Sequence, residues 1–269
     1  MGLWIASDLG KHKERCIVQT DIGLSEIPKV KKWKDVRKMS LMGTSIEKIS
    51  ESSSPDCPEL TTLFLASNER LTTISGDFFR SMPRLLVLNL SRCYNLNGLP
   101  EKISRLSSLR CLGLAGTQMD RLPVGFQELK MLIHLNLEFT KVVSCDWISN
   151  LSRLRTLKLA GSQVWLDMSL MKELQLLKHL EFVSINICSS LVGKLLLYDP
   201  RVGRCIQYIN IEDRIIASIR FASNGYSPSH QYMEIWREGD RGSREDTIEQ
   251  KSYKSSVLLK SLLCANKRV

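Results

Sequence analysis

The stretch Leu85-Leu-Val-Leu-Asn-Leu-Ser-Arg-Cys93 decides the fold, because its pattern returns in Leu109-Arg-Cys-Leu-Gly-Leu-Ala-Gly-Thr117. Each stretch reads apolar, two free positions, apolar, one free position, apolar, two free positions, then a compact residue. Apolar residues two positions apart have the period of a strand with one face buried. An amphipathic helix would place them every three or four positions. The two stretches therefore predict two short strands in successive units.

Copies of this pattern recur along the chain at a nearly constant interval. The clear copies are Val36/Met39/Leu41/Thr44, Leu60/Leu63/Leu65/Asn68, Leu85/Leu88/Leu90/Cys93, Leu109/Leu112/Leu114/Thr117, Leu132/Leu135/Leu137/Thr140 and Leu154/Leu157/Leu159/Ser162. A weaker copy is Leu177/Leu180/Phe182, and a last, doubtful one is Ile206/Ile209/Ile211. The central residues from Met39 to Leu180 are 24, 25, 24, 23, 22 and 23 residues apart. The gap of 29 residues from Leu180 to Ile209 predicts an insertion.

A period of about 20 to 29 residues with this pattern is typical of leucine-rich repeats. One repeat cannot cover its own apolar face, so neighbours must stack on it. We therefore predict an α/β solenoid, a leucine-rich-repeat horseshoe with a short parallel strand per repeat on the concave face. Irregular or short helical segments should form the convex face, where Pro100 and Pro123 favour an extended return.

Compact side chains occupy the turn that follows each predicted strand. They are Thr44, Asn68, Cys93, Thr117, Thr140 and Ser162. Most of them can form hydrogen bonds with the turn backbone, which would otherwise be buried without partners.

The chain divides into three segments. Residues 1–35 are expected to form an N-terminal helix and a lead-in, and residues 36–213 the leucine-rich repeats. Residues 214–269 read as an irregular C-terminal tail, since 222–256 are polar, with a short helix predicted at 257–263. The ordered C-terminal cap that a solenoid needs is not evident in the sequence.

Several segments together resemble one family. They are Leu24-Ser-Glu-Ile-Pro-Lys-Val-Lys-Lys-Trp33, Val36-Arg-Lys-Met-Ser-Leu-Met42, and Ile74-Ser-Gly-Asp-Phe-Phe-Arg-Ser-Met-Pro83 leading into Leu85–Ser91. These resemble the repeat region of plant coiled-coil-type nucleotide-binding leucine-rich-repeat immune receptors. Asn89 stands where the family usually has Asp. Residues 1–10 are similar to the helix that ends the family's nucleotide-binding module.

The resemblance implies a role in defence. The family's repeats recognise a pathogen effector or an effector-modified host protein, and they restrain the nucleotide-binding module. The expected partners are therefore such proteins or a nucleotide-binding receptor domain. No G-x-x-x-x-G-K-[ST] motif is present, so the family's nucleotide switch cannot be carried over to this chain.

Composition and charge narrow the classes of protein to which this chain could belong. The chain has 269 residues, 43% hydrophobic and 25% charged, and no apolar run long enough for a transmembrane helix. Its net charge of +10 suggests acidic partners, although no motif predicts nucleic-acid binding. The eight cysteines are scattered without a CxxC pair, and no secretion signal precedes them. We expect reduced thiols in the cytoplasm, with any membrane contact made through partners.

The sequence gives little support for a catalytic site. The four histidines have no metal-ligand spacing, and no nucleophile or zinc-protease motif is present. We therefore predict no enzymatic activity, no metal and no cofactor.

The candidate protein-binding residues flank the buried positions of the predicted strands. On the concave face they are Lys38, Met42, Phe64, Val87, Asn89, His134, Asn136, Glu138, Lys158, His179 and Glu181. A lateral basic set near the strand starts comprises Arg37, Arg84, Arg110, Arg153, Arg155 and Lys178. It is either solvated charge or a dock for an acidic face of a neighbouring domain.

Three interpretations remain open. The chain is a recognition module of a receptor, a stand-alone intracellular signalling scaffold, or a truncated fragment without function. Leu3, Trp4, Ile5 and Leu9 would form an exposed apolar helix unless another domain covered them, which favours the receptor.

Overall fold

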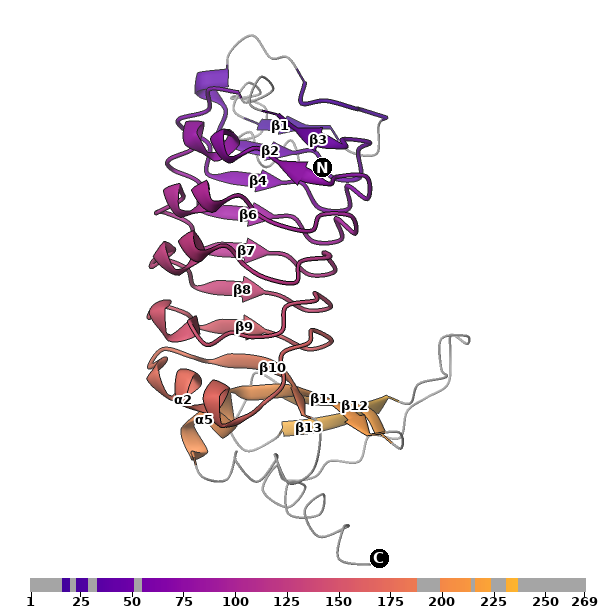
Figure 1. Cartoon of the computed structure of the whole chain (residues 1–269), viewed down its shortest axis with the longest axis vertical. Helices are drawn as coiled ribbons and strands as arrows, with labels where there is room; N and C mark the ends of the chain where they lie inside the picture. The colour runs from indigo at the N-terminus through magenta and orange to yellow at the C-terminus, as the bar shows by residue number, and fades with distance from the viewer. Residues whose placement is uncertain are drawn as a thin grey trace, which may run out of the picture.

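The structure, a computed structural model, describes residues 16–19, 23–28, 33–50, 55–187, 199–213, 216–223 and 231–236. The predicted helices at residues 1–10 and 257–263 lie outside the described residues. Within them, an elongated stack of repeats carries one strand per repeat (Figure 1).

One sheet of eleven strands runs the length of the stack. In order its strands are β1 (Cys16–Val18), β2 (Lys38–Ser40), β4 (Thr62–Phe64), β6 (Val87–Asn89), β7 (Cys111–Gly113), β8 (His134–Asn136), β9 (Thr156–Lys158), β10 (Phe182–Ile187), β11 (Ile206–Asp213), β12 (Ile216–Ser223) and β13 (Gln231–Trp236). All neighbours from β1 to β11 are parallel, and β12 and β13 are antiparallel. A second parallel pair, β3 (Lys48–Ile49) and β5 (Thr73–Ile74), lies on the return side.

The predicted central residues form successive rungs of one interior. Met39 pairs with Leu63, and the same register continues through Leu88, Leu112, Leu135 and Leu157. These side chains are at most 1% exposed. Each rung therefore removes apolar surface from water only with its neighbours in place, which confirms the predicted solenoid.

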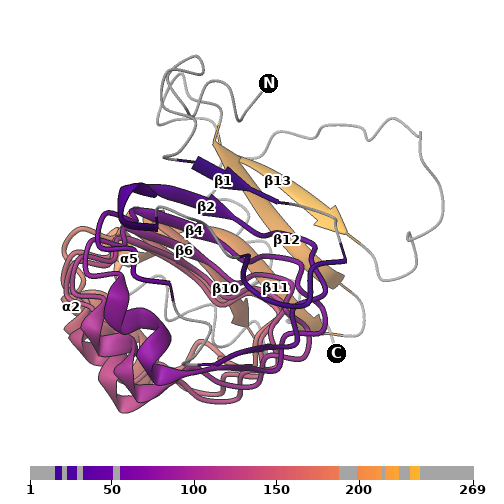
Figure 2. The same cartoon turned by 90° about the horizontal axis from the view of Figure 1, so that it is seen from above.

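Short helices cover the side of the interior opposite the sheet, as seen along the stack in Figure 2. They are the 3-10 helices η2 (Trp33–Asp35), η4 (Gly76–Ser81), η5 (Glu101–Arg105), η6 (Val124–Glu128) and η7 (Ile148–Asn150), and the α-helices α2 (Met168–Leu176) and α5 (Pro200–Cys205). Pro100 and Pro123 occupy the positions just before η5 and η6 with extended backbone, as their fixed φ favours.

The turn after each strand is closed by the compact side chains predicted for it. Thr117, Thr140 and Ser162 donate hydroxyl hydrogen bonds of 2.6 to 2.8 Å to the carbonyl three residues earlier. The residue before each turn side chain has a positive φ, between 57° and 72°. These residues are Gly43, Ser67, Arg92, Gly116, Phe139 and Gly161. These bonds confirm the prediction that the compact side chains of the turns form hydrogen bonds with the turn backbone.

The predicted register of the seventh repeat is wrong. Leu157 pairs with Val183 rather than with Leu180, which lies ahead of β10. The correct copy is Leu180/Val183/Ile185, and Val183 follows Leu157 by 26 residues. The extra residues lie in this repeat because it holds α2, an α-helix of nine residues, where the preceding repeat has the 3-10 helix η7 of three. Val183 then pairs with Ile206, 23 residues on, and a register shift brings Ile185 opposite Ile209, so the expected 29-residue gap disappears.

Both ends of the repeat region also differ from the prediction. In the lead-in, β1 adds a rung in which Ile17 pairs with Met39. In the predicted irregular tail, β12 and β13 form an antiparallel extension beside β11. This extension covers the edge that β11 would otherwise leave unpaired, so the cap that the sequence did not reveal is present.

Candidate protein-binding surface

The concave face is set by strand alternation, because every second side chain points away from the interior. One row of these side chains, aligned in register across successive strands, is Ser40, Phe64, Asn89, Gly113, Asn136, Lys158 and Ser184. Among the predicted binding residues, Lys38 is exposed in β2, and Met42 is half-buried just beyond that strand.

A hollow of about 440 Å³ lies over the centre of this face. It brings together six predicted residues, namely Phe64, Val87, Asn89, His134, Asn136 and Lys158. Cys111, Gly113 and Thr156 complete its rim and floor. Residues from five successive strands thus converge on one depression that could receive a side chain of another protein.

Hydrogen bonds fix the polar side chains around the hollow. The Asn89 side-chain oxygen accepts from the backbone N–H of Ser91 at 3.0 Å, and that of Asn136 accepts from the N–H of Glu138 at 2.9 Å. Nδ1 of His134 lies 3.0 Å from the hydroxyl oxygen of Thr156. These contacts order the rim before a partner arrives, which lowers the entropic cost of binding.

Two further contacts tie the predicted residues Lys158 and Glu138 to β10. The Lys158 ammonium lies 5.6 Å from the ring centroid of Phe182, in a cation–π contact. The Ser184 hydroxyl donates to Glu138 at 2.9 Å, across two repeats. Glu138 is thereby held toward β10 and does not line the hollow.

His179 and Glu181 are not on the concave face as predicted, because the register of their repeat is shifted. Both are exposed but lie ahead of β10, where Phe182 and Ser184 take the outward positions. The sequence analysis did not predict Phe182 and Ser184 as concave-face residues. The signal that could have found them is the better fit of Leu180/Val183/Ile185 to the repeat pattern.

The basic lateral set is exposed but does not form an unbroken row. Arg37, Arg110 and Arg155 occupy equivalent positions before β2, β7 and β9, with uncharged residues in the intervening repeats. Arg84 pairs with Glu59 at 2.6 Å and Arg155 with Glu181 at 3.2 Å. Arg153 lies two residues before Arg155, and Lys178 lies farther from its strand, three residues before Glu181. Glu59 and Glu181 therefore reduce the positive charge that this edge presents.

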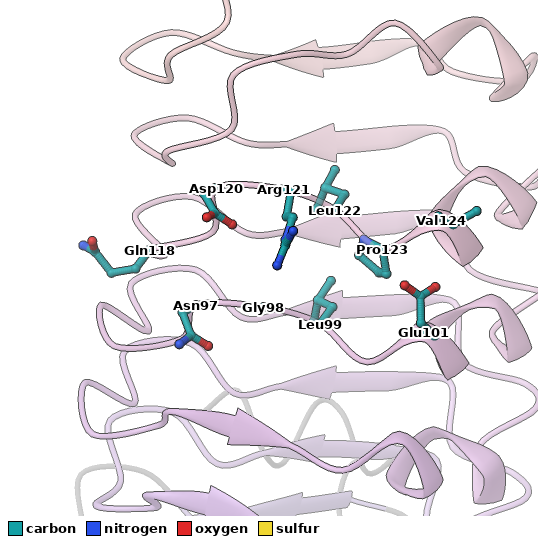
Figure 3. A pocket seen from close by; sticks show the side chains of 10 residues that line it. All are labelled: Asn97, Gly98, Leu99, Glu101, Gln118, Asp120, Arg121, Leu122, Pro123 and Val124. Atoms are coloured by element: carbon teal, nitrogen blue, oxygen red, sulfur yellow. The ribbon is translucent and has the colours of Figure 1, made fainter.

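A larger hollow of about 620 Å³ lies on the return side, between the segments 97–101 and 118–124. Figure 3 shows Leu99 and Leu122 in adjacent repeats and Arg121 extending toward the preceding segment. Glu101 accepts a hydrogen bond from the backbone N–H of Gly125 at 3.1 Å. The lining of this return-side hollow carries charges of both signs, so it does not favour one kind of ligand. The concave hollow is the stronger candidate because it also contains residues predicted from the sequence.

The cysteines of the described residues are free thiols. Burial is the main cause that raises the pKa of Cys57 and Cys145 to about 12, with the nearby Asp56 and Asp146 adding to it. Burial also raises the pKa of Cys93 to about 11 and that of Cys111 above its ordinary value. Protonated thiols are poor nucleophiles, so these residues act as small packing side chains.

The described part of the chain contains no group of three or more His, Cys, Asp or Glu side chains placed to hold a metal ion. Within the same part, no helix has the length and apolar character to cross a bilayer.

Comparison with known proteins agrees with this geometry. Residues 35–198 match the leucine-rich repeat region family. The chain is 57% identical over 214 residues to Disease resistance protein RFL1 of Arabidopsis thaliana, covering 79% of this chain and 24% of that protein. It is 48% identical over 257 residues to Disease resistance protein RPS5 of the same plant, covering 95% of this chain and 28% of that protein. The chain thus spans about a quarter of the length of these relatives. It belongs to the leucine-rich repeat family, and its repeats are of the kind carried by plant disease resistance proteins.

Proposed function

We propose that this chain is a non-enzymatic recognition surface in plant defence, which binds a pathogen effector or an effector-modified host protein in the cytoplasm. The observation that carries the proposal is the concave hollow, built on repeats that share 57% identity with a disease resistance protein. An apolar wall of Phe64 and Val87 beside polar residues suits a protein partner, since interfaces combine apolar contact with a few placed polar groups.

A nucleotide-binding receptor domain is the second proposed partner. The family resemblance supports it, as do exposed cations beside the strands such as Arg37 and Arg110. A lateral surface of this kind could dock a neighbouring acidic domain while the concave face stays open for recognition.

The test is binding of the purified chain to a panel of purified pathogen effectors, and to a purified nucleotide-binding receptor domain. Phe64→Ala and Lys158→Glu should weaken effector binding about tenfold or more, because a few central residues carry most interface energy. Gln118→Ala, on the return side, is the matched control and should bind normally. Effector binding that these concave variants leave unchanged would contradict the proposal.

A further inference from the structure

Gly113 forms the floor of the concave hollow, and its backbone conformation does not require glycine. The glycines with positive φ among the described residues are Gly43, Gly116 and Gly161. Gly113 instead is the last residue of β7, where glycine is less favourable than alanine because it loses more conformational freedom on folding. A glycine inside a strand often marks a place where a ligand or another backbone approaches closely.

The side chains of the preceding repeat account for the glycine. A Cβ at residue 113 would lie 2.7 Å from the side-chain oxygen of Asn89 and 2.9 Å from the hydroxyl oxygen of Ser91. Gly113 therefore lets Asn89 and Ser91 lie over β7, where both line the hollow.

Hydrogen-bond donors lie on both sides of Gly113 in the hollow. Asn89 and Asn136 flank Gly113 on either side in the sheet register. Their side-chain oxygens are occupied by backbone N–H groups, and their side-chain nitrogens have no hydrogen-bond partner among the described residues. Lys158 lines the hollow beside Asn136 and adds a cation, whose ammonium lies over the ring of Phe182 in the next strand. No Asp or Glu lines the hollow, because Glu138 is bonded to Ser184.

We propose that this hollow receives the carboxylate of an aspartate or glutamate side chain on the partner protein. The carboxylate would accept hydrogen bonds from the amide groups of Asn89 and Asn136 and pair with Lys158, a charge-assisted arrangement. Phe64 and Val87 would contact an aliphatic neighbour of that acid. The chain's net charge of +10 favours such a partner electrostatically. This inference rests on the proposed function and deepens it by naming the chemistry of the recognised residue.

The probe is a blocked peptide, acetyl-Ala-Leu-Glu-Ala-amide, titrated into the ¹⁵N-labelled full chain. The side-chain NH₂ signals of Asn89 and Asn136 are assigned with the variants Asn89→Ala and Asn136→Ala. Both signals should shift and saturate at roughly millimolar peptide, as expected for so small a ligand. The matched peptide with glutamine in place of glutamate should bind at least about tenfold more weakly, because it lacks the charge.

Substitutions in and beside the hollow locate the site. Gly113→Val should abolish the shifts by displacing the Asn89 and Ser91 side chains, whereas Ala115→Val, two residues beyond Gly113 and outside the hollow, should leave them intact. Lys158→Met should weaken binding about tenfold without affecting the fold, since the side chain is only half-buried on the surface. Urea unfolding of each variant confirms that it is folded.

Equal binding of the glutamate and glutamine peptides, or unchanged binding by Gly113→Val, would overturn the inference. Displacement of the peptide by a short single-stranded oligonucleotide, with affinity that exceeds that of the peptide, would also do so. These outcomes differ from failure of the proposed function. In that case the peptide still binds, but the concave variants leave effector binding unchanged.

Discussion

The side-chain nitrogen of Asn68 lies 2.8 Å from the carbonyl oxygen of Leu41, 27 residues earlier in the chain. It also donates to Leu65 at 2.8 Å, and its oxygen accepts from the backbone N–H of Thr44 at 2.9 Å. Asn68 is fully buried. One side chain therefore satisfies backbone groups of two successive turns that water cannot reach.

Replacing Asn68 by alanine should lower the free energy of unfolding by about 2 to 4 kcal/mol, because it leaves several buried backbone groups unpaired. Asn95→Ala is the control. Its side chain also donates to the preceding repeat, at 2.7 Å to Glu69, but it is exposed, so the loss should stay below about 1 kcal/mol. Urea denaturation measures both. Equal losses of unfolding free energy in the two variants would mean that burial does not determine how much these hydrogen bonds contribute to stability.

Gly125→Ala should destabilise the chain by about 1 to 3 kcal/mol, since forced contacts in a packed structure strain the backbone. A Cβ at residue 125 would lie 2.5 Å from the carbonyl oxygen of Glu101 in the preceding repeat. Gly98→Ala, where no atom lies within 4 Å, should change stability by less than about 1 kcal/mol. Thermal or urea unfolding compares the two, and a harmless Gly125→Ala would argue against this close approach of η5 and η6.

Acid should weaken the link between η4 and η5. The Lys102 ammonium bonds both oxygens of Asp77, at 2.7 and 2.8 Å, and this hydrogen bond is the main cause that lowers the pKa of Asp77 below its ordinary value of 3.8. Because the folded-state pKa is the lower one, the contribution is complete above the unfolded value. It is lost as pH falls through the folded value.

Lys102→Gln should therefore reduce stability at neutral pH and flatten its decline between about pH 5 and the acid limit. Urea unfolding at a series of pH values provides the measurement. Glu47→Gln, in an exposed pair with Arg70 at 3.7 Å, is the control and should leave the neutral-pH midpoint unchanged. If Lys102→Gln and the unaltered chain lost stability identically with falling pH, the Lys102–Asp77 pair would not stabilise the contact between η4 and η5.

Thiol reactivity should follow burial. Iodoacetamide at pH 8 should modify Cys111 on the half-exposed concave face well before Cys145, whose pKa is raised to about 12. Peptide mass spectrometry after timed quenching reads each site separately, and unfolding in urea should equalise the rates. Fast modification of Cys145 in the native chain would contradict the packing described for it.

The sequence predicted the repeats well where one signal acted alone. From Met39 to Leu157 the strand pattern and its spacing coincide with the observed rungs. The register failed where two periodicities overlap. Leu174 lies in α2, Leu177 is the C-cap of that helix, and three residues separate each of Leu174, Leu177 and Leu180 from the next. The repeat pattern begins with the same three-residue step. The predicted copy therefore starts at Leu177, three residues before the true start at Leu180, and its central residue falls on Leu180 instead of Val183.

The candidate site was predictable in position but not in shape. Alternation alone identifies Asn89, Asn136 and Lys158 as outward residues. The hollow depends on the hydrogen bonds that hold the two asparagine side chains over their own turns, which involve side-chain conformations that no sequence pattern encodes. The β12–β13 extension was missed because its short alternating runs are set among strongly polar residues.

The reversal of strand direction between β11 and β12 limits how this architecture can lengthen. A duplicated unit of about two dozen residues fits anywhere between rungs that run the same way, and it would move the flanking binding residues apart by one strand spacing, about 4.8 Å. The same unit added after β12 would lie against a strand of opposite direction and would break the parallel register that all strands from β1 to β11 share. A unit inserted within the parallel part keeps that register, and it also changes the distance between binding residues on either side of it.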